Sequence, residues 1–428
     1  MNDRATPSLR IARLVISNFR TFHGPIEIPL ASGGVADEMP VFHGGNGTGK
    51  SNALAALDLF FRASAYLLRR REGISIDINI GRWNERDDYT GLVISPRDWP
   101  PGIRDPLAIE VEFSDGLFLK VKLMPAGNEV MARLEMLEPL FLGNDDAEEL
   151  ALTNKLRSRL EAPLGPESKP LFILGARRRH YRSPGEGQPS DGVPATPLSA
   201  EMATLLANLA TSLDPGETER WRAFVGLVGR IPTLQGREVS IVRTPEGADL
   251  RFEIRGRQIL RLSELSSGEQ QVVAICAAVL TSRAAIVAIE EPEISLHPDN
   301  QRLIRDILLE QVRSGLVDQI LLESHVPTFD GPEVIRFTRG SDGATSVARQ
   351  PSAANDELRG KARTSGAADK WVTAEGYTQL PEAMIHDLGV QAGGHVWFLR
   401  PSPERHWEAW AEGELDQMFG AEDAPSEK

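Results

Sequence analysis

The residue types best suited to chemistry lie at residues 44–52, where the sequence reads GGNGTGKSN. This stretch follows the apolar run 39–42 and precedes residues 53–61, ALAALDLFF, which have helical composition. A strand, a glycine-rich loop and a helix in this order form the context that a phosphate-binding loop requires. The sequence therefore predicts a nucleotide site of the Walker A type.

Each residue type in this loop has a physical role. Glycines let the backbone curl so that its N–H groups face phosphate oxygens, and the following helix adds the positive end of its dipole. Lys50 would reach the β- and γ-phosphates, and the Ser51 hydroxyl would hold Mg²⁺. The expected cofactors are ATP and Mg²⁺. The candidate binding residues here are Gly44, Asn46, Gly47, Thr48, Gly49, Lys50, Ser51 and Asn52.

A second polar cluster, LSELSSGEQQ at 262–271, leads into the apolar helical run 272–280. Ser-Ser-Gly at a helix start offers hydroxyl groups and free N–H groups, which suit a phosphate. Such caps are common, so this signal depends on the other motifs. The candidate residues are Ser266, Ser267, Gly268 and Glu269.

Two adjacent carboxylates, Glu290 and Glu291, follow the apolar strand predicted at 284–289. Buried carboxylates need a positive partner, and Mg²⁺ with an activated water is that partner in P-loop enzymes. We expect Glu290 to orient the metal together with Ser51, and Glu291 to position or deprotonate the attacking water. The alternative is an acidic turn exposed to solvent.

His325 lies just beyond another predicted strand, 319–322. A lone histidine is more often structural than catalytic. Ligands of open α/β sheets, however, sit at the ends of the strands, which favours a catalytic role for His325.

The remaining sequence predicts further strands and helices. Alternating apolar residues separated by turn residues indicate hairpins, and helical spacing indicates helices. Residues 183–197 are rich in Pro, Gly and Ser and predict a loop. The expected elements are strand pairs at 9–16 and 25–30 (with a turn at 18–20), 107–113 and 117–123, and 238–242 and 249–254, a strand at 171–174, and helices at 145–161 and 198–228.

The composition limits the class of protein. The chain has 428 residues, of which 41% are hydrophobic, and this length suggests two or three domains, or one large domain with an appendage. Its net charge of −14 disfavours non-specific binding to DNA or anionic membranes. The single cysteine, Cys276, lies in an apolar helical run and is expected to pack in the core. Neither a membrane-spanning run nor a signal peptide is visible, so we expect no membrane partner and a cytoplasmic location.

The order of these motifs resembles the ATP-binding-cassette ATPases, in the branch that contains SMC, RecF and OLD-type proteins. VISNFRTF at 15–22 resembles the opening of those heads, and GGNGTGKS resembles Walker A. LSSGE at 265–269 resembles the signature, and IVAIEEPE at 286–293 resembles Walker B. ISLHP at 294–298 resembles the D-loop, and SHVP at 324–327 the histidine switch. The resemblance covers about residues 1–340.

This resemblance implies an α/β P-loop NTPase head with a mixed sheet, an antiparallel β lobe and a helical lobe. It also implies that the signature of a second protomer completes the ATP site, so that Ser267 and Gly268 contact the γ-phosphate in trans. Asn18 and Arg20 would lie near the nucleotide. Glu290 departs from the usual Asp of Walker B, as in OLD-like heads, and a Q-loop has no clear match.

A shorter resemblance covers residues 371–399, which are similar to an AbrB-type swapped-hairpin module. The matching residues are Val372, Thr373, Gly376, Leu380, Pro381, Leu388, Gly389, Val390, Gly393 and Val396. That module is an intertwined dimer that often binds DNA. In residues 371–428, three basic residues against eleven acidic ones leave a charge of −8, which would repel DNA. We therefore expect dimerisation or partner docking, with a generic α/β cap as the alternative.

The predicted organisation is an ATPase head at 1–345 with a helical or variable insert at about 124–235, a linker at 346–370, the AbrB-like module at 371–418 and an acidic tail at 419–428. The leading hypothesis is an ATP-hydrolysing dimeric head that serves as a sensor or mechanical subunit of a bacterial anti-phage system with a separate effector. The first alternative is a RecF- or SMC-like DNA repair ATPase, for which the basic run 177–182 (Arg177 to Arg182) would contact nucleic acid. The second alternative is a structural scaffold locked by ATP.

Overall fold

The structure is a computed structural model, and it describes residues 8–70, 77–88, 90–136, 146–161, 163, 168–175, 200–244, 247–254, 259–352, 380–391, 396–399 and 408–411. The chain forms two compact units, residues 1–354 and 355–428. The boundary falls within the predicted linker. Most of that linker, the basic run 177–182 and the acidic tail lie outside the described residues.

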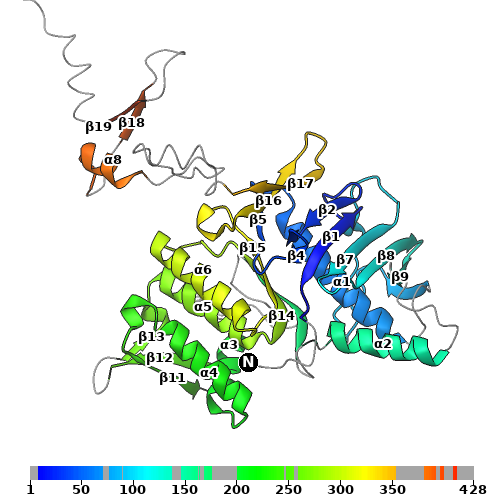
Figure 1. The fold of residues 1–428 in the computed structure, drawn as a ribbon, viewed down its shortest axis with the longest axis horizontal. Coiled ribbons are helices and arrows are strands. Elements are labelled where there is room, and N and C mark those ends of the chain that lie inside the picture. Colours follow the sequence, from blue (N-terminus) through cyan, green and yellow to red (C-terminus); the bar gives the residue numbers. More distant parts are fainter. Residues whose placement is uncertain are drawn as a thin grey trace, which may run out of the picture. The chain divides into compact units, whose positions relative to one another are not determined.

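A mixed sheet forms the centre of the first unit (Figure 1). Its order is β10-β14-β15-β5-β16-β17, in which all neighbouring strands are parallel except the last pair. The strands are β5 (Val41–His43), β10 (Lys169–Leu174), β14 (Ala284–Glu290), β15 (Gln319–Glu323), β16 (Glu333–Arg339) and β17 (Thr345–Pro351). Strands β5, β14 and β15 end at the same edge, because Glu290 pairs with Glu323 and Glu323 with Phe42.

A second, antiparallel sheet has the order β2-β1-β7-β8-β9-β6. Its strands are β1 (Ile11–Ser17), β2 (Ile26–Pro29), β6 (Ile78–Arg82), β7 (Leu107–Phe113), β8 (Phe118–Ala126) and β9 (Glu129–Met136). Inward-facing apolar residues alternate with polar ones along β8 and β9, as expected for a sheet with one buried face. The short pair β3 (Ala31–Ser32) and β4 (Val35–Ala36) lies beside β1.

Helix α1 (Lys50–Arg70) packs between the two sheets. Leu57 and Phe60 of α1 share one core with the antiparallel sheet and with Ile286 and Leu321 of the central sheet. The alternate central-strand residues Val287 and Leu322 face a second core. The central sheet is therefore buried on both faces, which explains the continuous apolar runs of β14 and β15.

The second core is closed by a helical lobe. It contains α3 (Ala200–Thr211), α4 (Pro215–Val228), α5 (Ser267–Thr281), α6 (Pro298–Arg313) and the small sheet of β11 (Glu238–Thr244), β12 (Gly247–Glu253) and β13 (Ile259–Arg261). Cys276 is fully buried in α5, and burial raises the pKa of its thiol to about 12. Its expected role in core packing is confirmed.

A buried glutamine joins the two sheets of the head. The Gln319 side chain accepts a hydrogen bond from Ile11 N (2.9 Å) and donates to the carbonyls of Ile11 and Asp37 (both 3.0 Å). It therefore satisfies backbone groups of the first strand from the start of β15. Since buried backbone groups without partners are costly, this side chain stabilises the packing of the N-terminal strand against the central sheet.

The predicted fold class, an α/β P-loop NTPase with mixed and antiparallel sheets, is confirmed. The expected strand pairs, the strand near 171–174 and the helix at 145–161, now α2 (Asp146–Glu161), appear close to their predicted bounds. The helical stretch predicted at 198–228 is divided into α3 and α4, because Asp214 caps a new helix that begins at Pro215. The predicted helical or variable insert at about 124–235 stays a prediction, and this range includes strands of both main sheets. Strand β9 pairs with β8 along its whole length, and β10 pairs with β14, so both belong to the two main sheets. Strand β17 also extends the head beyond residue 345.

The described residues of the second unit form helix α8 (Glu382–Asp387) and an antiparallel pair, β18 (Val396–Leu399) and β19 (Glu408–Ala411). Residues 371–379, where the AbrB-like pattern begins, lie outside the described residues.

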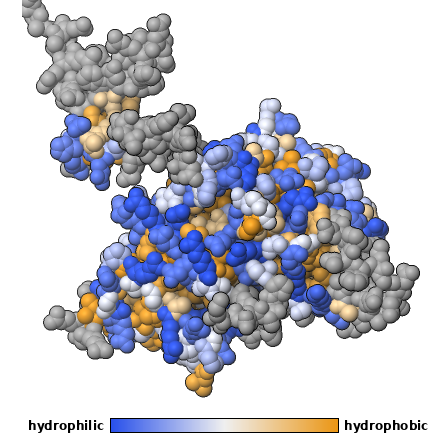
Figure 2. All heavy atoms as spheres, viewed as in Figure 1, coloured by the Kyte–Doolittle hydropathy of each residue, from blue (hydrophilic) through white to orange (hydrophobic). Residues whose placement is uncertain are grey.

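The visible face of the molecule carries mostly polar side chains interspersed with smaller apolar areas (Figure 2). Within the described ranges, every helix is too short or too polar to cross a lipid bilayer.

Candidate nucleotide and metal site

The loop 44–49 runs from the end of β5 to the start of α1, as the sequence predicted. Two of its glycines are required by close contacts. A Cβ on Gly44 would overlap the Phe337 carbonyl oxygen, and one on Gly49 (φ 106°) would overlap the Thr345 hydroxyl. Residues of β16 and β17 therefore lie so close to the loop that only glycine fits at positions 44 and 49.

Thr345 fastens this loop to its surroundings. Its hydroxyl donates to Thr48 O (2.9 Å) and lies within hydrogen-bonding distance of the Thr21 hydroxyl (2.8 Å), which can donate to it. Arg339, from the end of β16, donates to Gly47 O (3.3 Å). None of these three residues, Thr21, Arg339 and Thr345, was predicted as part of the site. They reach the loop through tertiary packing, which leaves no local pattern in the sequence.

Lys50 is buried, with a side chain only 3% exposed. Its Nζ donates to the carbonyl oxygens of Gly44 (2.8 Å) and Gly45 (3.0 Å) and lies 3.5 Å from Oε1 of Glu323. The ammonium group is thus held inside the loop that would receive the phosphates.

Glu323 is the main addition of the structure to the predicted site. It ends β15, and its Oε2 accepts a hydrogen bond from the Ser51 hydroxyl (2.8 Å). Burial raises the pKa of Glu323; Lys50 and Ser51 oppose this shift, and the negative charges of Glu290 and Glu291 add to it. From the sequence, Glu323 was predicted only as the end of a strand. Its place directly after four strand residues, 319–322, was a signal that could have marked it as a site residue.

The predicted Walker B residues lie beside Glu323. Glu290 ends β14 opposite Glu323 in the strand register, and Glu290 Oε2 lies 3.4 Å from where a Cβ on Gly175 would be. Glu291 N donates to Glu323 O (2.7 Å). Glu291 has a φ of 44°, a left-handed conformation that is uncommon for glutamate and points to a functional constraint on the backbone.

His325 contacts the predicted catalytic carboxylate directly. Its Nε2 lies 3.2 Å from Oε1 of Glu291. The backbone N–H of His325 donates to Oε1 of Glu293 (2.6 Å), and burial raises the pKa of Glu293. Glu293 was not predicted as a site residue, and here it holds the backbone that presents His325.

The donor set at this sheet edge suits a hard divalent cation. Ligand atoms of Glu291, Glu323 and His325 lie within 4.8 Å of one another, and the Ser51 hydroxyl lies against the same glutamate. Carboxylate and hydroxyl oxygens are the ligands that Mg²⁺ prefers. The residues therefore fit the predicted metal: Ser51, Glu291 and Glu323 would hold the ion or its bound waters. The metal-orienting role predicted for Glu290, the strand neighbour of Glu323, stays a prediction.

The signature residues stand at the start of α5. Ser266 caps this helix by accepting from Glu269 N (3.4 Å), and Glu269 Oε2 accepts from Ser266 N (2.9 Å). Burial works to raise the pKa of Glu269, but hydrogen bonds from Thr233 and Ser266 outweigh it and the pKa is lowered. Ser267 is exposed, whereas Gly268 is buried, with its Cβ position 2.8 Å from Ser295 O.

None of the hydrogen bonds that Ser266 and Glu269 make within the described residues reaches the loop 44–49 of the same head. The two predicted residues of the opening motif also differ in position. Arg20 lies against α1, 3.4 Å from Oδ1 of Asn52, and pairs with Asp98. Asn18 donates instead to Pro106 O (3.0 Å), so the structure brings Arg20 but not Asn18 to the phosphate-loop helix.

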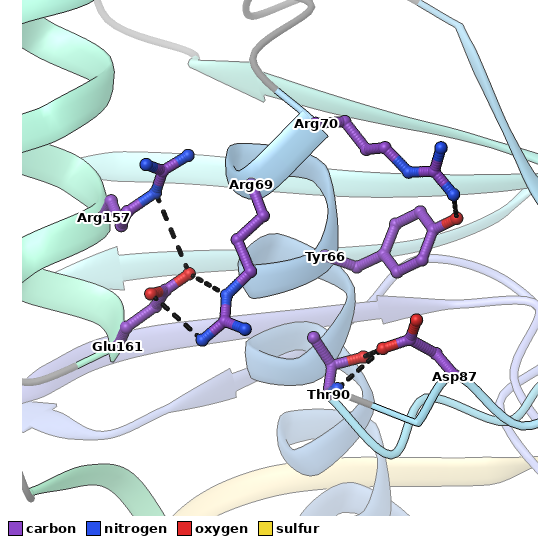
Figure 3. A pocket seen from close by; sticks show the side chains of 7 residues that line it. All are labelled: Tyr66, Arg69, Arg70, Asp87, Thr90, Arg157 and Glu161. Carbon is purple, nitrogen blue, oxygen red and sulfur yellow. Dashed lines mark hydrogen bonds and ion pairs between the residues drawn. The ribbon is translucent and has the colours of Figure 1, made fainter.

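A separate pocket of about 460 Å³ lies at the other end of α1 (Figure 3). Arg69 and Arg157 pair there with Glu161 of α2, and Arg70 donates to Tyr66. Since α1 has 21 residues, this pocket lies roughly 30 Å from Lys50 along the helix axis. It takes no part in the nucleotide site.

Comparison with known proteins agrees with an ATPase. A family model described as "AAA domain, putative AbiEii toxin, Type IV TA system" matches residues 208–330, less than a third of the chain. The match includes the signature, Glu290, Glu291, Glu323 and His325, but not Lys50. No curated protein matches the sequence.

Three solved structures are similar over most of the chain. An SMC head bound to the C-winged helix domain of ScpA has a TM-score of 0.48 at 14% identity, covering 81% of this chain and 99% of that one. The SMC head domain from Thermotoga maritima has a TM-score of 0.44 at 14% sequence identity, and the match covers 80% of this chain and 99% of that one. The third structure is an Smc head domain with an extended coiled coil bound to the C-terminal domain of ScpA derived from Pyrococcus furiosus. It has a TM-score of 0.46 at 12% sequence identity, and the match covers 83% of this chain and 99% of that one.

The strand–loop–helix geometry, the convergent acidic residues and the family-model match together support an ATPase head of the AAA/ABC type.

Replacing Lys50 tests the nucleotide site. Lys50→Ala should weaken ATP binding about 10–100-fold, because hydrogen bonds to charged groups contribute about 1.5–3 kcal/mol. Isothermal titration calorimetry measures this directly. Lys155→Ala, which removes an exposed lysine of α2, is the control and should bind ATP as the wild type does. Unchanged affinity in Lys50→Ala, with its thermal unfolding intact, would contradict the assignment of this loop.

Proposed function

We propose that this chain binds and hydrolyses ATP in heads that pair face to face. The observation that carries the proposal is the convergence of Lys50, Ser51, Glu323, Glu291 and His325 at one edge of the central sheet. Such a site combines a cation for the phosphates, oxygen ligands for Mg²⁺ and a base for water. These are the groups that phosphoryl transfer to water needs.

In the proposed reaction, a water oxygen attacks the γ-phosphorus, and the bond to the β–γ bridging oxygen breaks to give ADP and phosphate. Glu291 takes the proton of the attacking water, and His325, 3.2 Å away, holds the Glu291 carboxylate in place. Lys50 offsets the negative charge of the phosphates. Bound Mg²⁺ would supply further charge neutralisation at the phosphate oxygens.

The signature residues support a paired head. Ser267 is exposed at the start of α5, where free N–H groups and the helix dipole favour an anion. The hydrogen bonds of the signature stay within its own lobe among the described residues. We therefore propose that Ser267 and Gly268 contact the γ-phosphate on a second copy of the chain.

The family-model description favours a role in defence. It names a putative AbiEii toxin of a type IV toxin–antitoxin system, and the matched residues 208–330 hold the proposed signature and catalytic residues. We propose that the head is a sensor or mechanical subunit of a bacterial anti-phage system and that a separate protein carries the effector activity.

The second unit is proposed to dimerise as an AbrB-like module. Helix α8 follows Leu380 and Pro381, as the pattern expects, and β18 pairs with β19. A two-stranded sheet is marginally stable alone. Phe398 of β18 is 55% exposed, so a second copy would bury an apolar side chain as well as extend the sheet.

Glu291→Gln tests the proposed mechanism. The amide keeps the size of Glu291 but cannot accept the proton, so hydrolysis should fall about 10²–10⁴-fold while ATP still binds. The trapped ATP should hold two heads together. Light scattering with ATP, on a chain of residues 1–354 that lacks the second unit, should show more dimer than the wild type.

The matched control for this experiment is Ser267→Arg in the Glu291→Gln background. Bulk and charge at the closing surface should abolish the ATP-dependent dimer without changing ATP binding by a single head. Hydrolysis at the wild-type rate in Glu291→Gln would place the base elsewhere, and an inactive variant that stays monomeric with ATP would contradict the pairing of heads.

A second prediction concerns residues 371–418. The isolated segment should sediment as a dimer without ATP. Phe398→Asp should dissociate it, because a charge would be buried at the interface. His386→Asp, on the largely exposed surface of α8, should leave the dimer intact. A monomeric wild-type segment would count against the swapped-hairpin proposal.

A further inference from the structure

The carboxylate of Glu323 occupies an unusual position for a charged group. Its side chain is only 6% exposed, and it lies directly behind the phosphate loop at the carboxyl end of β15. Two groups of α1 contact it: Lys50 Nζ at 3.5 Å and the Ser51 hydroxyl at 2.8 Å. Within the described residues, Lys50 is the only cation paired with Glu323.

Among the described residues, the charged side chains that raise the pKa of Glu323 besides its burial are those of two other glutamates. Glu290 is its direct neighbour in the strand register, and Glu291 follows at the same edge. A buried carboxylate that loses its only cation is destabilised by several kcal/mol. The ion pair with Lys50 therefore stabilises the ionised form of Glu323.

The proposed function requires the same lysine for a second task. Lys50 now donates to Gly44 O and Gly45 O inside the phosphate loop. Bound phosphates would draw its ammonium group away from Glu323, so one cation would have to serve both the nucleotide and the buried carboxylate. A divalent cation beside Ser51 would relieve this conflict, since Ser51 donates to Glu323 and the ligand atoms of Glu323, Glu291 and His325 lie within 4.8 Å of one another.

We infer that Glu323 makes nucleotide binding depend on Mg²⁺: it penalises binding of the metal-free nucleotide and favours binding of the nucleotide together with the metal. This inference rests on the proposed function. Glu323 also orients Ser51, because a hydroxyl that donates its proton to a carboxylate presents its oxygen lone pairs to a cation. Glu323 is thus a positioning residue whose effect appears in binding before any chemistry occurs.

The sign of the effect distinguishes this role from a structural one. A residue needed only for packing would, when replaced, weaken nucleotide binding in the presence and absence of the metal alike. Replacing Glu323 by the isosteric, uncharged glutamine removes the competitor for Lys50. Binding of the metal-free nucleotide should therefore become tighter, while binding of the Mg²⁺ complex becomes weaker.

The experiment measures the dissociation constant of ADP by calorimetry on the full chain, once with Mg²⁺ and once with EDTA. In Glu323→Gln, the ratio of the EDTA value to the Mg²⁺ value should fall about tenfold or more relative to the wild type. Glu323→Asp keeps the charge and should retain much of the metal dependence. Asp318→Asn is the matched control, because Asp318 is a buried carboxylate at the opposite end of β15.

The outcomes separate the inference from the function on which it rests. An unchanged ratio in Glu323→Gln, or an equal fall in Asp318→Asn, would overturn the role of Glu323 and leave the ATPase proposal intact. A wild-type chain that binds neither ADP nor ATP would overturn the proposed function itself. The inference would be supported if Glu323→Gln bound ADP in EDTA more tightly than the wild type does and Asp318→Asn did not.

Discussion

The head depends on one electrostatic constraint: acidic side chains gather where parallel strands end, and the buried Lys50 lies beside them. Glu290, Glu291 and Glu323 lie at this edge, and Lys50 Nζ lies 3.5 Å from Glu323. Charges in such a setting are stable only with a cation and hydrogen bonds nearby. At the start of α1, Lys50 provides the cation and Ser51 the hydrogen bond. In the proposed function, Mg²⁺ provides the further positive charge that the three glutamates need.

The rest of the architecture holds this edge in register. Helix α1 packs between two sheets, so its first residues cannot shift away from the strand ends. Thr345 ties the phosphate loop to the edge of the sheet, and Gln319 ties the N-terminal strand to the start of β15. A site built on strands and a long helix is more rigid than one built on loops. In the proposed function, this rigidity would limit displacement of the bound phosphates relative to Glu291.

Much of this site could be predicted from sequence because its motifs are local. The loop 44–52, the paired Glu290 and Glu291, and His325 each follow an apolar strand, and that pattern places them at one edge. Glu323 was missed as a site residue because its role comes from the register between β14 and β15 and from the reach of Ser51. Thr345 and Arg339 were missed for the same reason. The pairing of β9 with β8 and of β10 with β14 could not be predicted either, because strand partners are set by tertiary structure.

The proposed pairing of heads requires that each ATP site combine Lys50 of one head with Ser267 of the other. Mixing Lys50→Ala with Ser267→Arg protein tests it most directly, by the rate of ATP hydrolysis. Each variant alone should be inactive. A mixed pair contains one site with an intact loop and an intact signature, so mixing should restore part of the wild-type rate. Full activity of Ser267→Arg alone, or no recovery on mixing, would contradict the shared site.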